Sequence, residues 1–115
     1  MDTKIFIRSA TENDIPVIFA LIKELAEFEK LADQIKTSED ELRNTLFGKD
    51  RFVEILLAEY EQKVVGQALF FKNFSTFIGK PGIYLEDLYV KPEMRGKGIG
   101  KALLDKIISI AKERN

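Results

Sequence analysis

The sequence contains no cysteine, no histidine and no tryptophan among its 115 residues. Without cysteine and histidine, the chain cannot form disulfides, Cys/His zinc sites or a nucleophile paired with an imidazole base. Proton transfer would then depend on Glu, Asp, Tyr, Lys or water. Chemistry that needs only substrate positioning and a polarised carbonyl is compatible with these absences, and no metal site is expected.

An excess of charge of one sign is also missing, since 18 basic residues face 19 acidic ones. Nucleic-acid-binding proteins usually carry a basic excess or stripe, so we expect no nucleic-acid partner. No apolar run approaches the ~20 residues of a membrane-spanning helix, and the N-terminus lacks a signal-peptide pattern. These absences predict a cytoplasmic protein without a membrane partner.

The length allows one domain with a modest core, and no repeat or linker divides it. We therefore expect a single domain over residues 1–115. Residues 4–8 alternate between polar and apolar, which predicts a short strand. A capping-box pattern at 11–14 precedes apolar residues at helical spacing from 15 to 26. Because Pro16 belongs in a first turn, Asn13 is an alternative N-cap for this helix.

The pair Thr37 and Ser38, with acidic residues three positions on, predicts a second helix that ends at Gly48. The apolar period then changes from helical to alternating. Residues 52–59 and 64–71 are strand-like runs, and the short segment between them predicts an antiparallel hairpin.

The C-terminal third predicts a turn-rich segment at 73–82, a strand at 83–90 and a helix from about Gly98 onward. The predicted order is β-α-α-β-β-β-α, an α/β (α+β) class with a mainly antiparallel sheet and flanking helices. Four phenylalanines are expected to be core residues and loop anchors rather than a base-stacking platform: Phe70, Phe71, Phe74 and Phe77.

The first candidate site is the glycine-rich segment Arg95-Gly-Lys-Gly-Ile-Gly100, at the junction between a strand and a helix. Glycines let backbone N–H groups converge, and a helix N-terminus adds unsatisfied donors and partial positive charge. Arg95 and Lys97 extend this positive charge, so the segment is suited to hold a phosphate. It matches neither the Walker A loop nor GxGxxG, and a flexible basic surface turn is the alternative.

The second candidate is the pair Glu86 and Asp87, inside a strand that is otherwise apolar on both faces. Adjacent strand residues point to opposite faces unless a bulge intervenes. One acid in a cleft could bind an amine or relay its proton, whereas a structural role in hydrogen bonding or ion pairing is the alternative. Glu24, Glu27 and Glu29 are expected on the solvated face of the first helix.

Together these segments resemble a known family. The stretch Leu85-Glu-Asp-Leu-Tyr-Val-Lys-Pro-Glu-Met-Arg-Gly-Lys-Gly-Ile-Gly100 is similar to the GNAT N-acetyltransferase motif, whose loop reads Arg/Gln-x-x-Gly-x-Gly/Ala. The likeness covers nearly the whole chain and is closest to diamine (spermidine/spermine-like) acetyltransferases, which share the stretch from Ile7 to Glu29 and the segment Phe77-Ile-Gly-Lys80.

The resemblance implies transfer of an acetyl group from acetyl-CoA to a primary amine, by direct attack on the thioester. The acceptor would be a diamine, a polyamine or a thialysine-like amine. By resemblance, Glu86 would be the catalytic residue that helps to deprotonate the ammonium through water. Asp87 and Glu29 would attract a cationic substrate, and Phe28 stands where the diamine enzymes tend to carry tyrosine. The residues implied in acetyl-CoA binding are Leu88, Tyr89, Val90, Arg95, Gly96, Lys97, Gly98, Ile99, Gly100 and Lys101.

Full-length members continue with further strands and a helix, so the resemblance implies a C-terminally truncated chain with a partial fold. Such a chain would expose the edge of the strand at 83–90, which predicts self-association, for example as a homodimer, and little turnover on its own. An alternative function is a truncated module that binds CoA or supports assembly without catalysis.

Overall fold

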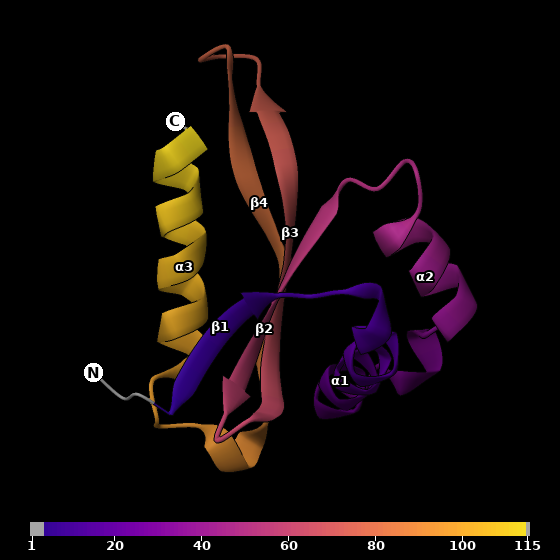
Figure 1. The fold of residues 1–115 in the computed structure, drawn as a ribbon. Coiled ribbons are helices and arrows are strands. Elements are labelled where there is room, and N and C mark those ends of the chain that lie inside the picture. Colours follow the sequence, from indigo (N-terminus) through magenta and orange to yellow (C-terminus); the bar gives the residue numbers. More distant parts are fainter. Residues whose placement is uncertain (1–3, 115) are drawn as a thin grey trace.

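The computed structural model describes residues 4–114 and contains four strands and three α-helices in the predicted order (Figure 1). Short 3-10 turns precede α1, α2 and α3. The α-helices and strands are β1 (Ile5–Ser9), α1 (Ile15–Phe28), α2 (Glu39–Phe47), β2 (Val53–Tyr60), β3 (Lys63–Ser75), β4 (Lys80–Val90) and α3 (Ile99–Arg114).

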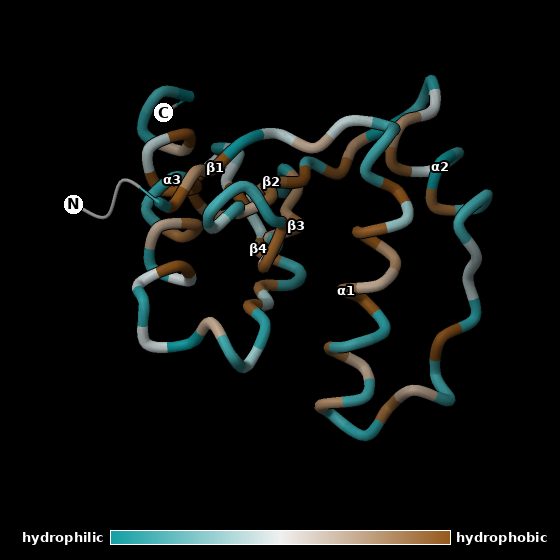
Figure 2. Tube along the Cα trace, turned by 60° about the horizontal axis from the view of Figure 1, so that its bottom comes forward, coloured by the Kyte–Doolittle hydropathy of each residue, from teal (hydrophilic) through white to brown (hydrophobic). Residues whose placement is uncertain are grey.

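The four strands form one antiparallel sheet in the order β1-β2-β3-β4. Helix α3 covers one face of the sheet, and α1 and α2 cover the other (Figure 1). Figure 2 shows that apolar residues alternate with polar ones along α1 and α3, as expected for helices with one buried stripe. The predicted fold class is therefore confirmed.

Each face of the sheet has its own apolar core. On the α3 face, Ile99, Leu103 and Ile107 pack with residues from β2 and β3. On the opposite face, Ile15 and Ile18 of α1 pack with α2 and with the alternate residues of the same strands. Strands β2 and β3 are buried on both faces, which explains their nearly continuous apolar sequence.

The start of α1 is held by a charged network. The Asp14 carboxylate accepts the backbone N–H of Thr11 at 2.7 Å, as the capping-box pattern predicted, and α1 begins at the next residue. Arg8 of β1 donates to both Asp14 oxygens, at 2.8 and 3.0 Å, and to Glu59 of β2 at 2.7 Å. The capping box therefore belongs to the 3-10 turn at Glu12–Asp14, and the N-cap of α1 is Asp14, neither Thr11 nor Asn13. At α2, Ser38 caps the helix as predicted, because its hydroxyl accepts the Glu41 N–H at 3.2 Å.

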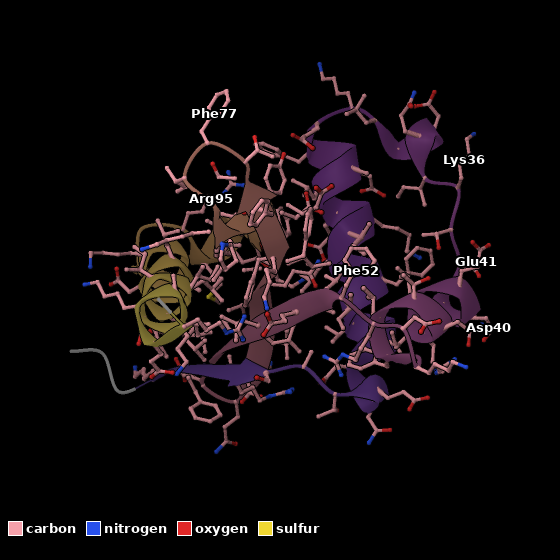
Figure 3. The ribbon with its side chains drawn as sticks, turned by 90° about the horizontal axis from the view of Figure 1, so that it is seen from above. Lys36, Asp40, Glu41, Phe52, Phe77 and Arg95 are labelled. Atoms are coloured by element: carbon pink, nitrogen blue, oxygen red, sulfur yellow. The ribbon has the colours of Figure 1, made fainter. Side chains whose placement is uncertain are left out.

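The hairpin of β3 and β4 is longer than the sequence predicted. The segment 73–82 was expected to be turn-rich, but β3 continues to Ser75 and β4 begins at Lys80. The hairpin extends beyond the helices, and Phe77 points away from the body of the molecule (Figures 1 and 3). Phe70 is a core residue as predicted, whereas Phe74 is 63% exposed and Phe77 is 99% exposed. The prediction that these last two anchor the loop is wrong, because no element packs against the hairpin tip within residues 4–114.

Strand β4 lies at the edge of the described sheet and contains a bulge. Leu69 of β3 pairs with Asp87, but the next residue, Phe70, pairs with Leu85, so Glu86 is the extra residue. A bulge changes the direction of the side chain at that position. Strict alternation along the strand is therefore broken where the two adjacent acids stand.

No helix within residues 4–114 is both long and apolar enough to cross a lipid bilayer.

Candidate functional site

A cavity of about 450 Å³ lies between the C-terminal end of α1, the end of β4 and the glycine-rich loop before α3. The sequence analysis indicated candidate residues in three separate segments: the end of the first helix, the strand at 83–90 and the glycine-rich loop. The fold places all three segments around this one cavity. Its lining residues are Leu25, Phe28, Glu29, Leu88, Tyr89, Val90, Met94, Arg95, Gly96, Gly98, Ile99, Gly100 and Lys101.

The glycine-rich loop has a backbone that only glycine adopts without strain. Gly96 and Gly98 have φ values of +84° and +83°, in the left-handed region, where an ordinary residue costs about 1–2 kcal/mol. An added Cβ at either position would meet no atom within 4 Å, so backbone conformation and not space requires glycine here. The sequence prediction that these glycines shape the loop is consistent with this geometry.

The loop leads directly into α3 with free amide donors. Within residues 4–114, the first amide of α3 that bonds to a backbone carbonyl is that of Ala102, which donates to Gly98 at 3.0 Å. The preceding amides of the first turn have no intrahelical partner, as at any helix N-terminus. They lie at the positive end of the helix dipole and beside the cavity, so the loop can accept a phosphate.

The three cations of the loop differ in placement. Arg95 stacks its guanidinium 4.7 Å from the ring centre of Phe28, which joins the loop to the end of α1. Lys101 lines the cavity and pairs with Asp105 one turn on, at 2.7 Å. Lys97 lies outside the cavity, over the ring of Tyr60 at 5.3 Å, and it lines a groove between β1 and α3 instead.

Carboxylates gather where α1 ends near the middle of β4. Asp87 is half-buried, and its pKa is raised, first by burial and then by the charges of Glu86 and Glu29. We call these three residues the acid cluster. No described cation forms an ion pair with any of them. A site with uncompensated negative charge attracts a cation such as an ammonium group.

The acid cluster is not arranged as a metal site. Within residues 4–114, no group of three or more Asp, Glu, His or Cys side chains could hold a metal ion.

Sequence reasoning missed the role of Glu24. It was expected on the solvated face of α1, but its carboxylate reaches β4 and the residue after it. The Tyr89 hydroxyl donates to Glu24 Oε1 at 3.1 Å, and the Lys91 ammonium donates to Oε2 at 2.6 Å. Burial, and then the hydrogen bond to Glu24, raise the pKa of Tyr89. The helical period alone could not show this contact, because it depends on how α1 lies against the sheet.

A second polar group lies under α1. Gln67 of β3 is fully buried, and it pairs in register with Tyr89. Neither its Oε1 nor its Nε2 atom has a hydrogen-bond partner among the described residues. An unsatisfied buried amide destabilises a fold by roughly 1–3 kcal/mol.

The cavity therefore contains most of the predicted residues. Of those implied in acetyl-CoA binding, all but Lys97 line it. Phe28 and Glu29 also line it, whereas Glu86 and Asp87 lie beside it on β4. The sequence did not predict that Leu25 and Met94 line the cavity. Leu25 fits the apolar stripe of the first helix, and nothing in the sequence around Met94 marks it as a site residue.

Several known proteins are similar to this chain in sequence or in fold. Residues 19–115 match the model of the acetyltransferase (GNAT) family. The thialysine N-epsilon-acetyltransferase of Bos taurus is 44% identical, over 96% of this chain and 69% of that protein. The spermidine/spermine N(1)-acetyltransferase-like protein 1 of Homo sapiens is 36% identical, over 91% of this chain and 16% of that protein. A solved aminoglycoside acetyltransferase from an uncultured soil metagenomic sample is 24% identical with a TM-score of 0.80, over 98% of this chain and 73% of that one, and shares the fold.

The chain belongs to the GNAT acetyltransferase family, whose members use acetyl-CoA. The resemblance inferred from the glycine-rich loop and the N-terminal stretch is confirmed.

Proposed function

We propose that this chain transfers the acetyl group of acetyl-CoA to a primary amine of a small molecule, a diamine, polyamine or thialysine-like amine. The observation that carries the proposal is the cavity, which has a glycine-rich loop suited to a phosphate at one end and the acid cluster beside the other. The names of two similar relatives, a thialysine N-epsilon-acetyltransferase and a spermidine/spermine N(1)-acetyltransferase-like protein, support the same class of acceptor.

Acetyl-CoA supplies an activated thioester carbonyl and a pyrophosphate, and the residues present fit both requirements. The amides of Gly98 through Lys101 and the side chain of Arg95 would hold the pyrophosphate. The end of β4, at Leu88 to Val90, lines the cavity and lies at the edge of the described sheet, where backbone groups are left unpaired. A backbone N–H there would polarise the carbonyl oxygen.

The acid cluster would bind the amine and manage its proton. An amine attacks only as the neutral base, so its ammonium form must first lose a proton. Glu86, an exposed residue at the bulge, would take this proton through water, while Asp87 and Glu29 hold the cationic substrate. The amine attacks directly, so no covalent nucleophile is required, which agrees with a sequence that has neither cysteine nor histidine.

Isothermal titration with acetyl-CoA, comparing the wild-type chain with Gly98→Asp, tests the phosphate-binding loop. The variant strains the left-handed backbone and places a carboxylate where the phosphate would bind. We expect affinity to fall by about 100-fold or more, in line with a lost charged contact of a few kcal/mol.

Gly79→Asp is the matched control, because Gly79 also has a positive φ (+68°) and open space but lies at the hairpin tip. It should bind acetyl-CoA as the wild type does. Equal binding by both variants would show that the loop is not the phosphate site. A folded wild-type chain that binds no acetyl-CoA would refute the proposed function for this chain. Binding without acetyl transfer to a diamine would favour the alternative, a CoA-binding module.

We also propose self-association, supported by the edge position of β4 and by exposed apolar side chains on the hairpin and on α3. They include Phe74, Phe77, Ile78, Leu104 and Ile108. Sedimentation velocity at micromolar concentration should show a dimer or larger species, and a stable monomer would contradict the proposal. The cytoplasmic location stays a prediction.

A further inference from the structure

Two sets of charged groups link helix α1 with β4. The first set attracts the two elements to each other, and the second set repels them. In the first set, Glu24 accepts hydrogen bonds from the Tyr89 hydroxyl at 3.1 Å and from the Lys91 ammonium at 2.6 Å. We call these two bonds the tether. Both the Glu24 and Lys91 side chains are about one-third exposed, at 33% and 28%, so the pair is partly withdrawn from water. The tether attracts α1 to the end of β4.

The second set is the acid cluster. Glu29 follows Glu24 by five residues at the end of α1, and Asp87 precedes Tyr89 by two residues on the same strand. Residues two apart on a strand share a face, so Asp87 and Tyr89 are both directed toward α1. The charges of Glu29 and Asp87 repel each other across the two elements. Without a bound cation, the acid cluster therefore pushes α1 away from β4.

We propose that Glu24 is a positioning residue, whose tether to Tyr89 and Lys91 holds α1 against β4 and so keeps the acid cluster assembled before a cationic substrate arrives. The inference rests on the proposed function in one respect, namely that the acid cluster binds the acceptor amine. Glu24 does not itself line the cavity. It acts through the placement of Glu29 and Phe28, which follow it at the end of the helix.

The physical reason is preorganisation. A site that holds its charged groups in the binding geometry does not spend binding free energy to bring them together. Without the tether, repulsion between the carboxylates would favour a larger separation between the end of α1 and β4. The tether opposes that movement with one ion pair and one hydrogen bond, on the helical turn next to the acid cluster.

Glu24→Gln tests this role, because it keeps the size of the side chain but removes the charge that pairs with Lys91. We expect the Kd of 1,3-diaminopropane to rise about tenfold, the coupling expected for groups in one network. The Kd of acetyl-CoA should rise much less than tenfold, because the amides of the glycine-rich loop lie between β4 and α3 and only the Arg95–Phe28 contact joins that loop to α1. A merely structural role would weaken both ligands together.

Glu54→Gln is the matched control, since Glu54 also forms a short ion pair, with Arg114 at 2.6 Å, but lies at the start of β2 away from the cavity. It should leave the affinities for both ligands unchanged. Diamine affinity equal in the wild type and Glu24→Gln, or a parallel loss of diamine and acetyl-CoA binding, would overturn the proposal.

A second measurement does not require that any amine binds. The pKa of Asp87, followed by carboxyl ¹³C NMR, should fall in Glu24→Gln and also in Lys91→Met, because a loosened α1 reduces the burial of Asp87 and moves Glu29 away. Removing the Lys91 charge alone would instead raise the pKa of a nearby acid. A rise in Lys91→Met would therefore overturn the tether, even if the wild-type chain binds no diamine. If the wild-type chain binds no diamine but the pKa of Asp87 falls in both variants, the tether stands and only the assignment of a diamine as acceptor is refuted.

Discussion

The two ends of helix α1 use charge in opposite ways. At its N-terminal end, Arg8 lies between Asp14 and Glu59 and bonds to both, so each acid has a cation. The guanidinium lowers the pKa of Asp14 to about 2. At its C-terminal end, Glu29 approaches Asp87 and Glu86 without a paired cation, and burial and these neighbours raise the pKa of Asp87.

This difference separates charges that build the fold from charges that are available for a ligand. A satisfied network of opposite charges contributes stability at neutral pH, whereas like charges held together reduce it. Residues that reduce stability are retained in proteins mainly where they serve function. The comparison therefore assigns a structural role to the first group of acids and supports a substrate-binding role for the second.

The largest effect is expected for Asp14→Asn. Because the pKa of Asp14 is lowered from 3.8 to about 2, its contribution is present above about pH 4 and is lost as the pH falls toward 2. At about 1.4 kcal/mol per pH unit, the variant should lose about 2 kcal/mol of unfolding free energy at pH 7. Urea denaturation at several pH values should show the two proteins converge near pH 2.

Asp40→Asn is a suitable control for this experiment. The Asp40 side chain is 92% exposed and points outward from the start of α2, although it pairs with Arg43 (Figure 3). Its loss should change the unfolding free energy by less than about 0.5 kcal/mol. A constant difference between Asp14→Asn and the wild type from pH 7 to pH 2 would contradict the assigned cause.

A smaller effect of opposite sign is expected for Asp87→Asn. The raised pKa of Asp87 means that its ionised form destabilises the fold, so stability is lost as the pH rises through that pKa. The variant should be more stable than the wild type at pH 7, by less than Asp14→Asn loses, and the difference should shrink in acid. It should also bind the diamine more weakly.

Glu29→Gln should give a still smaller gain, because Glu29 is the weakest of the three causes that raise the pKa of Asp87. Denaturation midpoints of both variants at pH 4 and pH 7 check the order. If either variant is less stable than the wild type at pH 7, the acid cluster is not a source of repulsion.

The sequence predicted more of the fold than of the site. Periodicity and caps gave every strand and α-helix in the correct order, because these features depend on residues close together in the chain. The glycine-rich loop was also predicted, since three glycines at a strand-to-helix junction contradict ordinary helix preference. The extent of the long hairpin was not predicted. Phe74 and Phe77 are large apolar side chains of a kind that usually lies buried, but both are exposed on this hairpin.

Local sequence patterns were sufficient to predict the order of the elements, the family and the segments that form the cavity. Local patterns carry this information because backbone conformation and capping act over a few residues. The three-dimensional fold was needed to show that Glu86 is the bulged residue and that Lys97 lies outside the cavity. It was also needed to show that Glu24 bonds to Tyr89 and Lys91. Those features depend on strand register and on how a helix packs against a sheet. Contacts between residues far apart in the chain determine both.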